Sequence, residues 1–181
     1  LLEMQLSIDQ EEYNRLVRDK LGYLVRLLES YLKVLQMCSE RDVVVFRFCS
    51  LWFAAATTTT DTGDLEAINV KIGPVLAAVP SHKFLPCVYQ LAAKYQTLST
   101  DSRTHSLLTT LLRRLIFKHP HHSVMQFIAL SVGPMAHSGH KRPSPDSIDV
   151  NNARDLLAVV KTTRACADTI KAIEQCAAAY A

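Results

Sequence analysis

Histidine imidazoles are the side chains of this chain with the widest choice of chemistry, because they bind metals and exchange protons near neutral pH. Four of the seven histidines, His105, His119, His121 and His122, lie within one short stretch. Zinc sites favour H-x-x-x-H on one helical face or cysteine pairs a few residues apart, and the run from His119 to His122 has neither spacing. We therefore predict no metal site. We expect His119 or His122 to cap and pack a turn between helices through N–H bonds to backbone carbonyls.

Cysteine thiols are the second candidate group, as nucleophiles or as disulfide partners. The chain has five cysteines, an odd number, and no C-x-x-C pair. Cys49 and Cys87 lie in strongly apolar sequence, where a thiol tends to stay protonated and inert. This pattern predicts reduced, mostly buried thiols in a reducing compartment. The five are Cys38, Cys49, Cys87, Cys166 and Cys176.

Two further motifs match functional patterns only in part. Asp61-Thr62-Gly63 reads as the D-T-G of aspartic proteases, but that chemistry needs two carboxylates placed by β structure, which the flanking sequence does not offer. His137 and His140 lie in a segment rich in Gly, Pro and Ser, which is poorly suited to holding a metal. We attribute both matches to chance.

Two basic segments could recognise charged partners. Ser144-Pro145 follows Lys141-Arg142 and could be a phosphorylation or recognition segment. Arg113-Arg114 forms a small basic patch with Lys118. We interpret the first as a solvated linker and the second as a solvated helix face. The sequence thus predicts no catalytic, cofactor-binding or metal-binding residue.

The composition is typical of a globular, mostly helical chain. Its 181 residues suffice for one domain or a piece of a larger one, and 49% of them are hydrophobic. The formal net charge is +3, and the 20 Lys and Arg are scattered among 17 Asp and Glu, which argues against direct nucleic-acid binding. No apolar run approaches the ~20 residues that cross a bilayer, and no signal peptide opens the chain. We expect a soluble intracellular protein with no membrane partner.

The N-terminal part predicts a long amphipathic helix. Asp9 with Glu12 can form a capping box at its start, and Ser7 with Gln10 is a competing choice. Its apolar stripe is wide, and charged residues lie largely outside it. The stripe comprises Tyr13, Leu16, Val17, Leu21, Leu24, Leu28, Tyr31, Leu32 and Leu35.

Asp42 can cap a second helix that runs to Phe53, although β-branched and aromatic residues in 43–48 could also form a strand. We favour the helix because the run exceeds ten residues. The polar segment 57–63 predicts a surface loop. Asp64 can cap a short helix to Lys71, which Gly73-Pro74 interrupts, and a brief helical turn follows over 75–79.

The central stretch predicts a pair of amphipathic helices. Apolar residues recur at helical spacing from Leu85 to Tyr95 and again from Leu107 to Ile116. Pro86 is tolerated in the first turn of the earlier helix. Pro120 disfavours a helical conformation for the preceding residue, and Ser123 can cap a third helix through residue 128.

The C-terminal part combines an irregular segment with one more helix. Residues 132–147 are rich in Gly, Pro, His and Ser and predict an exposed loop. Ser147 or Asp149 can cap the final helix, whose face of small apolar residues permits close approach of a neighbouring helix. This face comprises Ala153, Leu156, Leu157, Val160, Ala167, Ile170, Ile173, Ala177 and Tyr180.

The alternation of amphipathic helices with short turns predicts an all-α fold of antiparallel helical pairs, stacked as an α-solenoid. We expect one continuous helical region over residues 1–181, with loops near 57–63 and 132–147. The chain starts at Leu1 and ends in Ala-Ala-Ala-Tyr-Ala, so we expect it to be a fragment.

Three ordered blocks carry a family resemblance. They are V-F-R-F-C-S-L-W at 45–52, K-F-L-P-C-V-Y-Q-L-A-A at 83–93, and H-P-H-H at 119–122. In order and spacing they resemble the FAT region of the ATM-type (ataxia-telangiectasia-mutated) phosphatidylinositol-3-kinase-related protein kinases. The resemblance covers roughly residues 42–130 and is loose in both flanks. The sequence departs from the family around Thr57 and after Val132.

The resemblance implies a scaffold of a nuclear serine/threonine kinase that uses ATP with Mg or Mn and signals DNA double-strand breaks. Such helices would cradle the kinase domain, contact the remainder of the kinase chain and contribute to homodimer contacts. The kinase domain is expected C-terminal to residue 181. This chain has no Gly-rich phosphate loop, no D-F-G and no Asp-to-Asn catalytic loop. No cofactor is therefore expected within it.

Two other classes of protein remain open at this point. A free-standing helical-repeat adaptor that binds protein partners would be a complete, stable monomer with capped ends. A small helical metal or thiol enzyme would need stoichiometric metal or a low-pKa cysteine.

Overall fold

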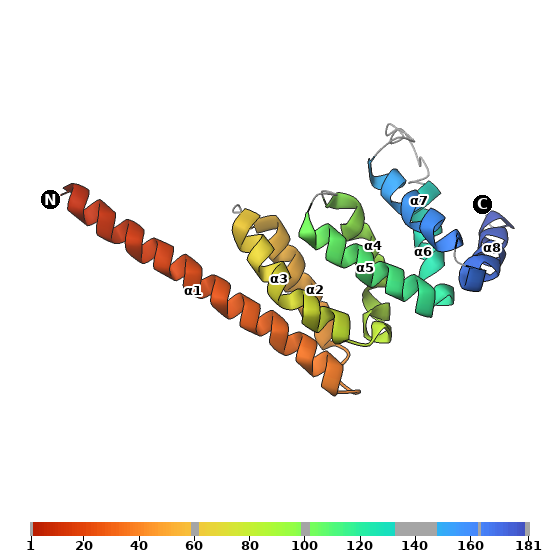
Figure 1. Cartoon of the computed structure of the whole chain (residues 1–181), viewed down its shortest axis with the longest axis horizontal. Coiled ribbons are helices and arrows are strands. Elements are labelled where there is room, and N and C mark those ends of the chain that lie inside the picture. Colours follow the sequence, from red (N-terminus) through yellow and green to blue (C-terminus); the bar gives the residue numbers. More distant parts are fainter. Residues whose placement is uncertain (1, 59–61, 99–101, 133–147, 163, 180–181) are drawn as a thin grey trace. The chain divides into compact units, whose positions relative to one another are not determined.

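The computed structural model describes residues 2–58, 62–98, 102–132, 148–162 and 164–179. Every regular element in these ranges is a helix, which confirms the all-α prediction. No helix in these ranges is both long and apolar enough to cross a membrane. The elements are α1 (Leu2–Met37), α2 (Val44–Thr58), α3 (Thr62–Ala78), the 3₁₀ helix η1 (Ser81–Cys87), α4 (Val88–Thr97), α5 (Arg103–Lys118), α6 (Pro120–Val132), α7 (Ile148–Lys161) and α8 (Arg164–Ala179) (Figure 1).

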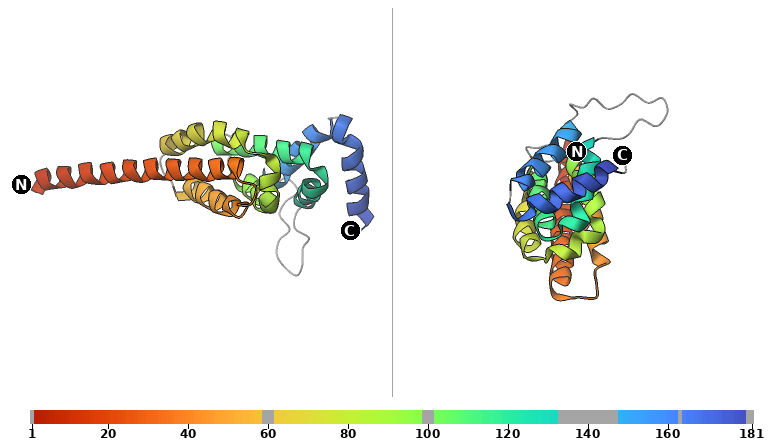
Figure 2. Two further views of the ribbon diagram at one scale, coloured as in Figure 1. Left: turned by 90° about the horizontal axis from the view of Figure 1, so that it is seen from below. Right: turned by 90° about the vertical axis from the view of Figure 1, so that its right-hand side faces the viewer.

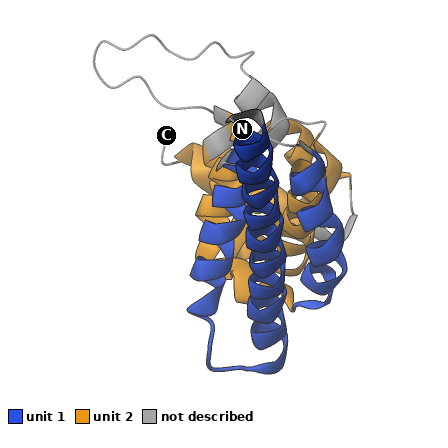
Figure 3. Ribbon diagram, turned by 90° about the vertical axis from the view of Figure 1, so that its left-hand side faces the viewer, with its two compact units in different colours: residues 1–79 blue, residues 80–181 orange. Residues whose placement is uncertain are grey.

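The chain divides into two compact units, Leu1–Val79 and Pro80–Ala181 (Figure 3). In unit 1, α1 packs against both α2 and α3, which lie on either side of it (Figure 2). Leu28, Leu32 and Leu35 of α1 are fully buried in this unit. The C-terminal half of α1 is therefore the common partner of the other two helices.

The N-terminal half of α1 differs from the prediction in two ways. The helix begins at Leu2, so the proposed capping residues lie inside it, and the Asp9 carboxylate accepts a 3.1 Å bond from Gln5 Nε2 one turn earlier. Its share of the apolar stripe is exposed, with Tyr13 at 62% and Leu16 at 56%. Helical periodicity reports which residues share a face, but it does not report whether a partner covers that face.

α2 is a helix, as favoured over the strand, and Val45 N–H donates to the Asp42 carbonyl at 3.0 Å at its start. Its largest side chain, Trp52, is fully buried. The indole N–H of Trp52 donates to the side-chain oxygen of Asn69 on α3 at 3.0 Å. Because Asn69 is also buried, this bond satisfies an amide that would otherwise be costly to bury.

Two predicted interruptions around α3 are wrong. Residues 57–58 end α2 and 62–63 begin α3, so the surface loop expected over 57–63 is at most the segment 59–61, which lies outside the described residues. α3 also continues through Pro74 instead of breaking at Gly73-Pro74. Proline deprives the carbonyl of Val70, four residues earlier, of its helical partner. Both Pro74 and Val70 are on the exposed side, where water can satisfy that carbonyl.

Unit 2 begins with a 3₁₀ helix, whose last residues occupy the place where the first turn of an α-helix was predicted from Leu85. Residues 81–87 form η1, with Pro86 inside it, and α4 starts only at Val88. α5 matches its prediction closely, and its buried face packs against η1, α4, α6 and α7. The buried residues of α5 are Thr104, Leu108, Leu111, Leu112, Leu115 and Ile116.

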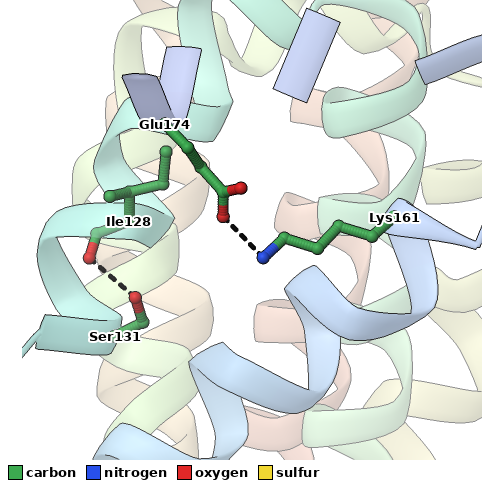
Figure 4. Close-up of polar contacts among 4 residues, drawn as sticks. All are labelled: Ile128, Ser131, Lys161 and Glu174. Carbon is green, nitrogen blue, oxygen red and sulfur yellow. Dashed lines mark hydrogen bonds and ion pairs between the residues drawn. The ribbon is translucent and has the colours of Figure 1, made fainter. Parts of the chain in front are cut away.

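The single final helix predicted after residue 147 is two helices, α7 and α8. Thr162 follows α7, and its hydroxyl donates to the Val159 carbonyl at 2.7 Å. Such a side-chain bond competes with the helical ladder and favours an end there. Lys161 Nζ and Glu174 Oε1 form a 2.5 Å ion pair that joins α7 to α8, and nearby on α6 Ser131 Oγ donates to the Ile128 carbonyl (Figure 4).

The predicted face of the final helix is partly confirmed. Its members Leu156, Leu157, Val160 and Ile170 are buried. The loop expected at 132–147 lies outside the described residues from 133 onwards, as does the proposed cap at Ser147. Val132 itself ends α6.

The core assignment predicts the effect of truncating Trp52. Trp52→Ala should lower the free energy of unfolding by about 2 to 5 kcal/mol, because it leaves a cavity and removes the donor that Asn69 accepts from. Leu91→Ala, at a fully buried position of α4, should cost a similar amount in unit 2. Urea unfolding followed by circular dichroism measures both. Tyr23→Ala is the control, because Tyr23 is 70% exposed and should change stability by no more than about 0.5 kcal/mol. Equal losses from all three variants would contradict the core assignment.

Candidate functional site

Several hydrogen bonds converge on the turn between α5 and α6, where the sequence places His119 to His122. His119 ends α5 with φ −139° and ψ 56°, outside the helical region, as the following proline requires. Its backbone N–H donates to the Leu115 carbonyl at 2.8 Å. Pro120 then opens α6, a position where its missing N–H costs nothing. The pair His119-Pro120 thus ends one helix and starts the next.

The hydrogen-bond partners of the side chains around this turn differ from the predicted ones. His119 Nε2 lies 3.1 Å from the hydroxyl of Ser81 in η1, and not at a backbone carbonyl. Ser123 lies inside α6 and donates to the His119 carbonyl at 2.8 Å, so it is not the cap of that helix. Both serines are buried. Helical spacing gave no sign that η1 folds back onto the turn, so the Ser81 contact could not be predicted.

The electrostatic surroundings of His119 favour its neutral form. Burial lowers the pKa of His119, and the nearby His82, His122 and Lys118 lower it further. A serine beside a histidine can act as a nucleophile, but Ser81 is only 4% exposed and out of reach of a substrate carbonyl. We therefore interpret the Ser81–His119 pair as a bond that fixes η1 to the α5–α6 turn.

His105 is held by a second local arrangement in unit 2. Its ring stacks on Tyr95 of α4 with 4.5 Å between centroids and 17° between planes. Ser102 caps α5 by accepting the backbone N–H of His105 at 3.1 Å. In the described part of the chain the Nε2 atom of His105 is buried without a hydrogen-bond partner, and burial lowers the pKa of the ring. The imidazole serves here as an aromatic packing surface.

The prediction of buried thiols has a mixed outcome. Cys49 and Cys87 are buried as expected, whereas Cys38 and Cys176 are exposed, because each sits near a helix end outside the buried face. The side chain of Cys166 lies outside the described residues. Among the side chains that the structure places, no three His, Cys, Asp or Glu residues are arranged to hold a metal ion.

The remaining candidates fall into two groups. His121 and His122 are exposed at the start of α6. In the predicted basic patch, Arg113 and Lys118 are exposed. Arg114 is half-buried, and this burial lowers the pKa of its guanidinium group. The other candidates lie outside the described residues. These are Asp61, His137, His140, Lys141, Arg142, Ser144 and Pro145.

One feature visible in the sequence was missed, because the charges were counted over the whole chain. Between Ala67 and Pro145 the only acidic residue is Asp101, whereas all seven histidines lie there. The same segment contains nine Lys and Arg residues. They are Lys71, Lys83, Lys94, Arg103, Arg113, Arg114, Lys118, Lys141 and Arg142.

Comparison with known proteins places this helical chain among large kinases. No protein-family profile matches it. It is 32% identical over 136 residues to "Serine/threonine-protein kinase ATM" of Arabidopsis thaliana, which covers 73% of this chain and 3% of the relative. It is 30% identical over 131 residues to "Serine-protein kinase ATM" of Sus scrofa, which covers 72% of this chain and 4% of the relative. The chain thus spans only a few per cent of the length of these relatives.

The solved structures that it resembles supply the fold. The chain superposes on "FAT and kinase domain of CtTel1" with a TM-score of 0.75 at 20% identity, over 93% of this chain and 10% of the other. The open conformation of CtTel1 gives the same TM-score at 21% identity, over 93% of this chain and 6% of the other. The fold and these matches define a helical segment that is homologous to a small part of much larger proteins. The chain belongs to the ATM/Tel1 kinases, and it matches their helical FAT region.

The Ser81–His119 bond leads to a stability prediction. Ser81→Ala should lower the free energy of unfolding by about 1 to 2 kcal/mol, because it removes a hydrogen bond to a partly buried ring nitrogen. Ser106→Ala is the matched control, since Ser106 is exposed on α5 and should change stability by less than about 0.5 kcal/mol. Thermal unfolding at neutral pH measures both. If the two variants melt alike, the bond contributes nothing to stability.

The histidine environments predict a loss of stability in acid. Because burial lowers the pKa of His105 and His119 below the ordinary 6.5, the folded state binds fewer protons than the unfolded state below that pH. Stability should therefore fall as the pH drops from 7 through the lowered pKa values. His105→Phe keeps the stack on Tyr95 and should reduce this fall, as urea unfolding at a series of pH values would measure. An unchanged pH dependence would contradict a role for His105.

Proposed function

We propose that this chain is a non-catalytic scaffold segment of an ATM-like serine/threonine-protein kinase and that its helices hold the kinase domain in position. The observation that carries the proposal is the alignment with relatives of that name over about 70% of this chain and 3 to 4% of theirs. A segment so small relative to its relatives fits a structural part of the whole enzyme. Phosphoryl transfer, with ATP and Mg or Mn, is assigned to residues outside the segment.

The remainder of the kinase chain is the first partner that we propose. Support comes from α1, whose N-terminal half exposes Leu6, Tyr13 and Leu16 by more than half. Their stripe continues the one that buries Leu28 and Leu32 in unit 1. Isolated apolar side chains on a surface are ordinary, but a continuous exposed stripe marks an interface. Further helices of the same kinase would cover it.

The cellular role that we propose follows from the family. ATM-type membership supports a part in the response to DNA double-strand breaks, in the nucleus, within a kinase that forms a homodimer. The segment would contribute rigidity to that assembly and would contact protein, with no direct nucleic-acid or membrane contact. Its buried core, with Trp52 and Leu91 fully enclosed, is close-packed and resists deformation, which supports a part in holding other domains in position.

The first test is the transcript downstream of the Ala181 codon. We expect it to encode a nucleotide-binding lobe followed by an Asp-to-Asn catalytic loop and D-F-G. A stop codon immediately after Ala181 would overturn the scaffold proposal and favour the adaptor alternative.

The second test uses the intact kinase and compares a buried with an exposed substitution in α4. Leu91→Ala should lower both the melting temperature and the rate of phosphorylation of a peptide substrate, because the segment no longer holds its shape. Tyr89→Ala is the matched control, since Tyr89 is 62% exposed and should leave both quantities unchanged. A kinase that melts earlier with Leu91→Ala but keeps its full rate at low temperature would contradict the positioning role.

A further inference from the structure

The exposed side of α5 carries basic residues near both ends of the helix and no acidic residue. Arg103, Arg113 and Lys118 are exposed on α5, as are the uncharged Ser106 and Thr110 between Arg103 and Arg113. Arg113 and Lys118 are five residues apart, so they lie on the two flanks of the exposed side. The six buried residues of α5 occupy the opposite side. Over the 16 residues of this helix the face extends about 24 Å.

The α5–α6 corner continues this face. His121 and His122 are exposed at the start of α6, and His82 is exposed on η1, which packs against α5. His82, His122 and Lys118 lie close enough to His119 for their charges to act on it. The first turn of α6 adds the partial positive charge of a helix N-terminus. Imidazoles, a lysine and backbone N–H groups thus meet at one end of the basic face.

Acidic side chains are missing from the four elements that carry this surface, although α7, which packs on the buried side of α5, contains Asp155. η1, α4, α5 and α6 contain no Asp or Glu. Within the described ranges Arg113 and Lys118 form no ion pair, although Glu12–Arg15 and Lys161–Glu174 do so on other helices. An exposed surface with one sign of charge attracts ligands of the opposite sign. This surface therefore favours anionic ligands over cationic ones.

The neighbouring apolar side chains indicate the class of ligand. Phe117 is 37% exposed one turn after Arg113, and Met125 is 43% exposed one turn after His121. Aromatic, Met and Arg side chains are enriched in protein–protein interfaces. A nucleic-acid site typically neutralises about 6–10 phosphates, more than this face can with its few exposed Lys and Arg residues. A polypeptide with both carboxylates and apolar side chains fits the surface better.

We propose that this basic surface, formed by the exposed face of α5 with His82, His121 and His122, docks an acidic protein segment rich in Asp and Glu. Arg113 and Lys118 pair with its carboxylates, and the imidazoles donate hydrogen bonds to them. Phe117 and Met125 contact apolar side chains of the same segment. This role is separate from the proposed contact with the remainder of the kinase chain, which uses the exposed apolar stripe of α1.

The test measures binding of a fluorescent peptide of Asp, Glu and Leu to the full 181-residue chain by anisotropy. The same peptide with Asn and Gln in place of the acids is the ligand control. We expect saturable binding of the acidic peptide alone, weakening as salt is raised. The double variant Arg113→Gln/Lys118→Gln should bind it about tenfold more weakly. Lys20→Gln/Lys33→Gln is the matched variant, because both lysines are exposed on α1 and their loss changes the net charge equally; it should bind as the unaltered chain does.

Three results would overturn the proposal. The acidic peptide could fail to bind even at low salt. The two double variants could weaken binding equally, which would mean that only net charge matters. Duplex DNA could bind more tightly than the peptide and lose affinity in the α5 variant, which would make the surface a nucleic-acid site. The melting curves of both variants are the folding control. We expect them to match that of the unaltered chain, because all four substituted residues are exposed. A loss of binding then does not reflect a loss of folding.

Discussion

The buried face of α5 is the constraint on which unit 2 depends. η1, α4, α6 and α7 all pack against this helix, so its leucines and Ile116 are shared by four neighbours. A helix with so many partners has little freedom to rotate, because any rotation would expose apolar area at about 25 cal/mol per Å². Its ends must be equally well fixed. Ser102 caps one end and the His119-Pro120 turn closes the other.

α5 also explains why one helix can have two roles. Its apolar side supports the unit, and its solvent side is left for charges that a folded core would not tolerate. The absence of carboxylates from η1, α4, α5 and α6 is not needed for folding, since an Asp or Glu on an exposed face costs little. Because folding does not require these four elements to lack Asp and Glu, we attribute their lack to recognition of a partner, and this is the basis for the proposed docking surface.

The helices were predictable where one face is continuously buried. The helices α2 and α5 were predicted correctly from the spacing of their apolar residues, because in each helix these residues, such as Trp52 and Leu112, lie on one buried face. The errors arose where the outcome depends on non-local packing or solvent: α3 accommodates Pro74 on its exposed side, and Thr162 ends α7 through a local hydroxyl bond. The Ser81–His119 contact joins residues 38 apart, which no periodicity can reveal. The charge asymmetry was visible, but a whole-chain count concealed it.

Trp52 gives unit 1 an optical signal of its own. It is the single tryptophan of the chain, fully enclosed, with the rings of Phe48 and Phe53 at 5.5 and 5.4 Å. Indole emission responds to the polarity around the ring, so fluorescence excited at the red edge, where tyrosine does not absorb, reports the integrity of this unit alone. Far-ultraviolet dichroism instead sums over the helices of both units. Coincident transitions in the two signals mean that the units unfold together, and separated ones mean that each unit unfolds by itself.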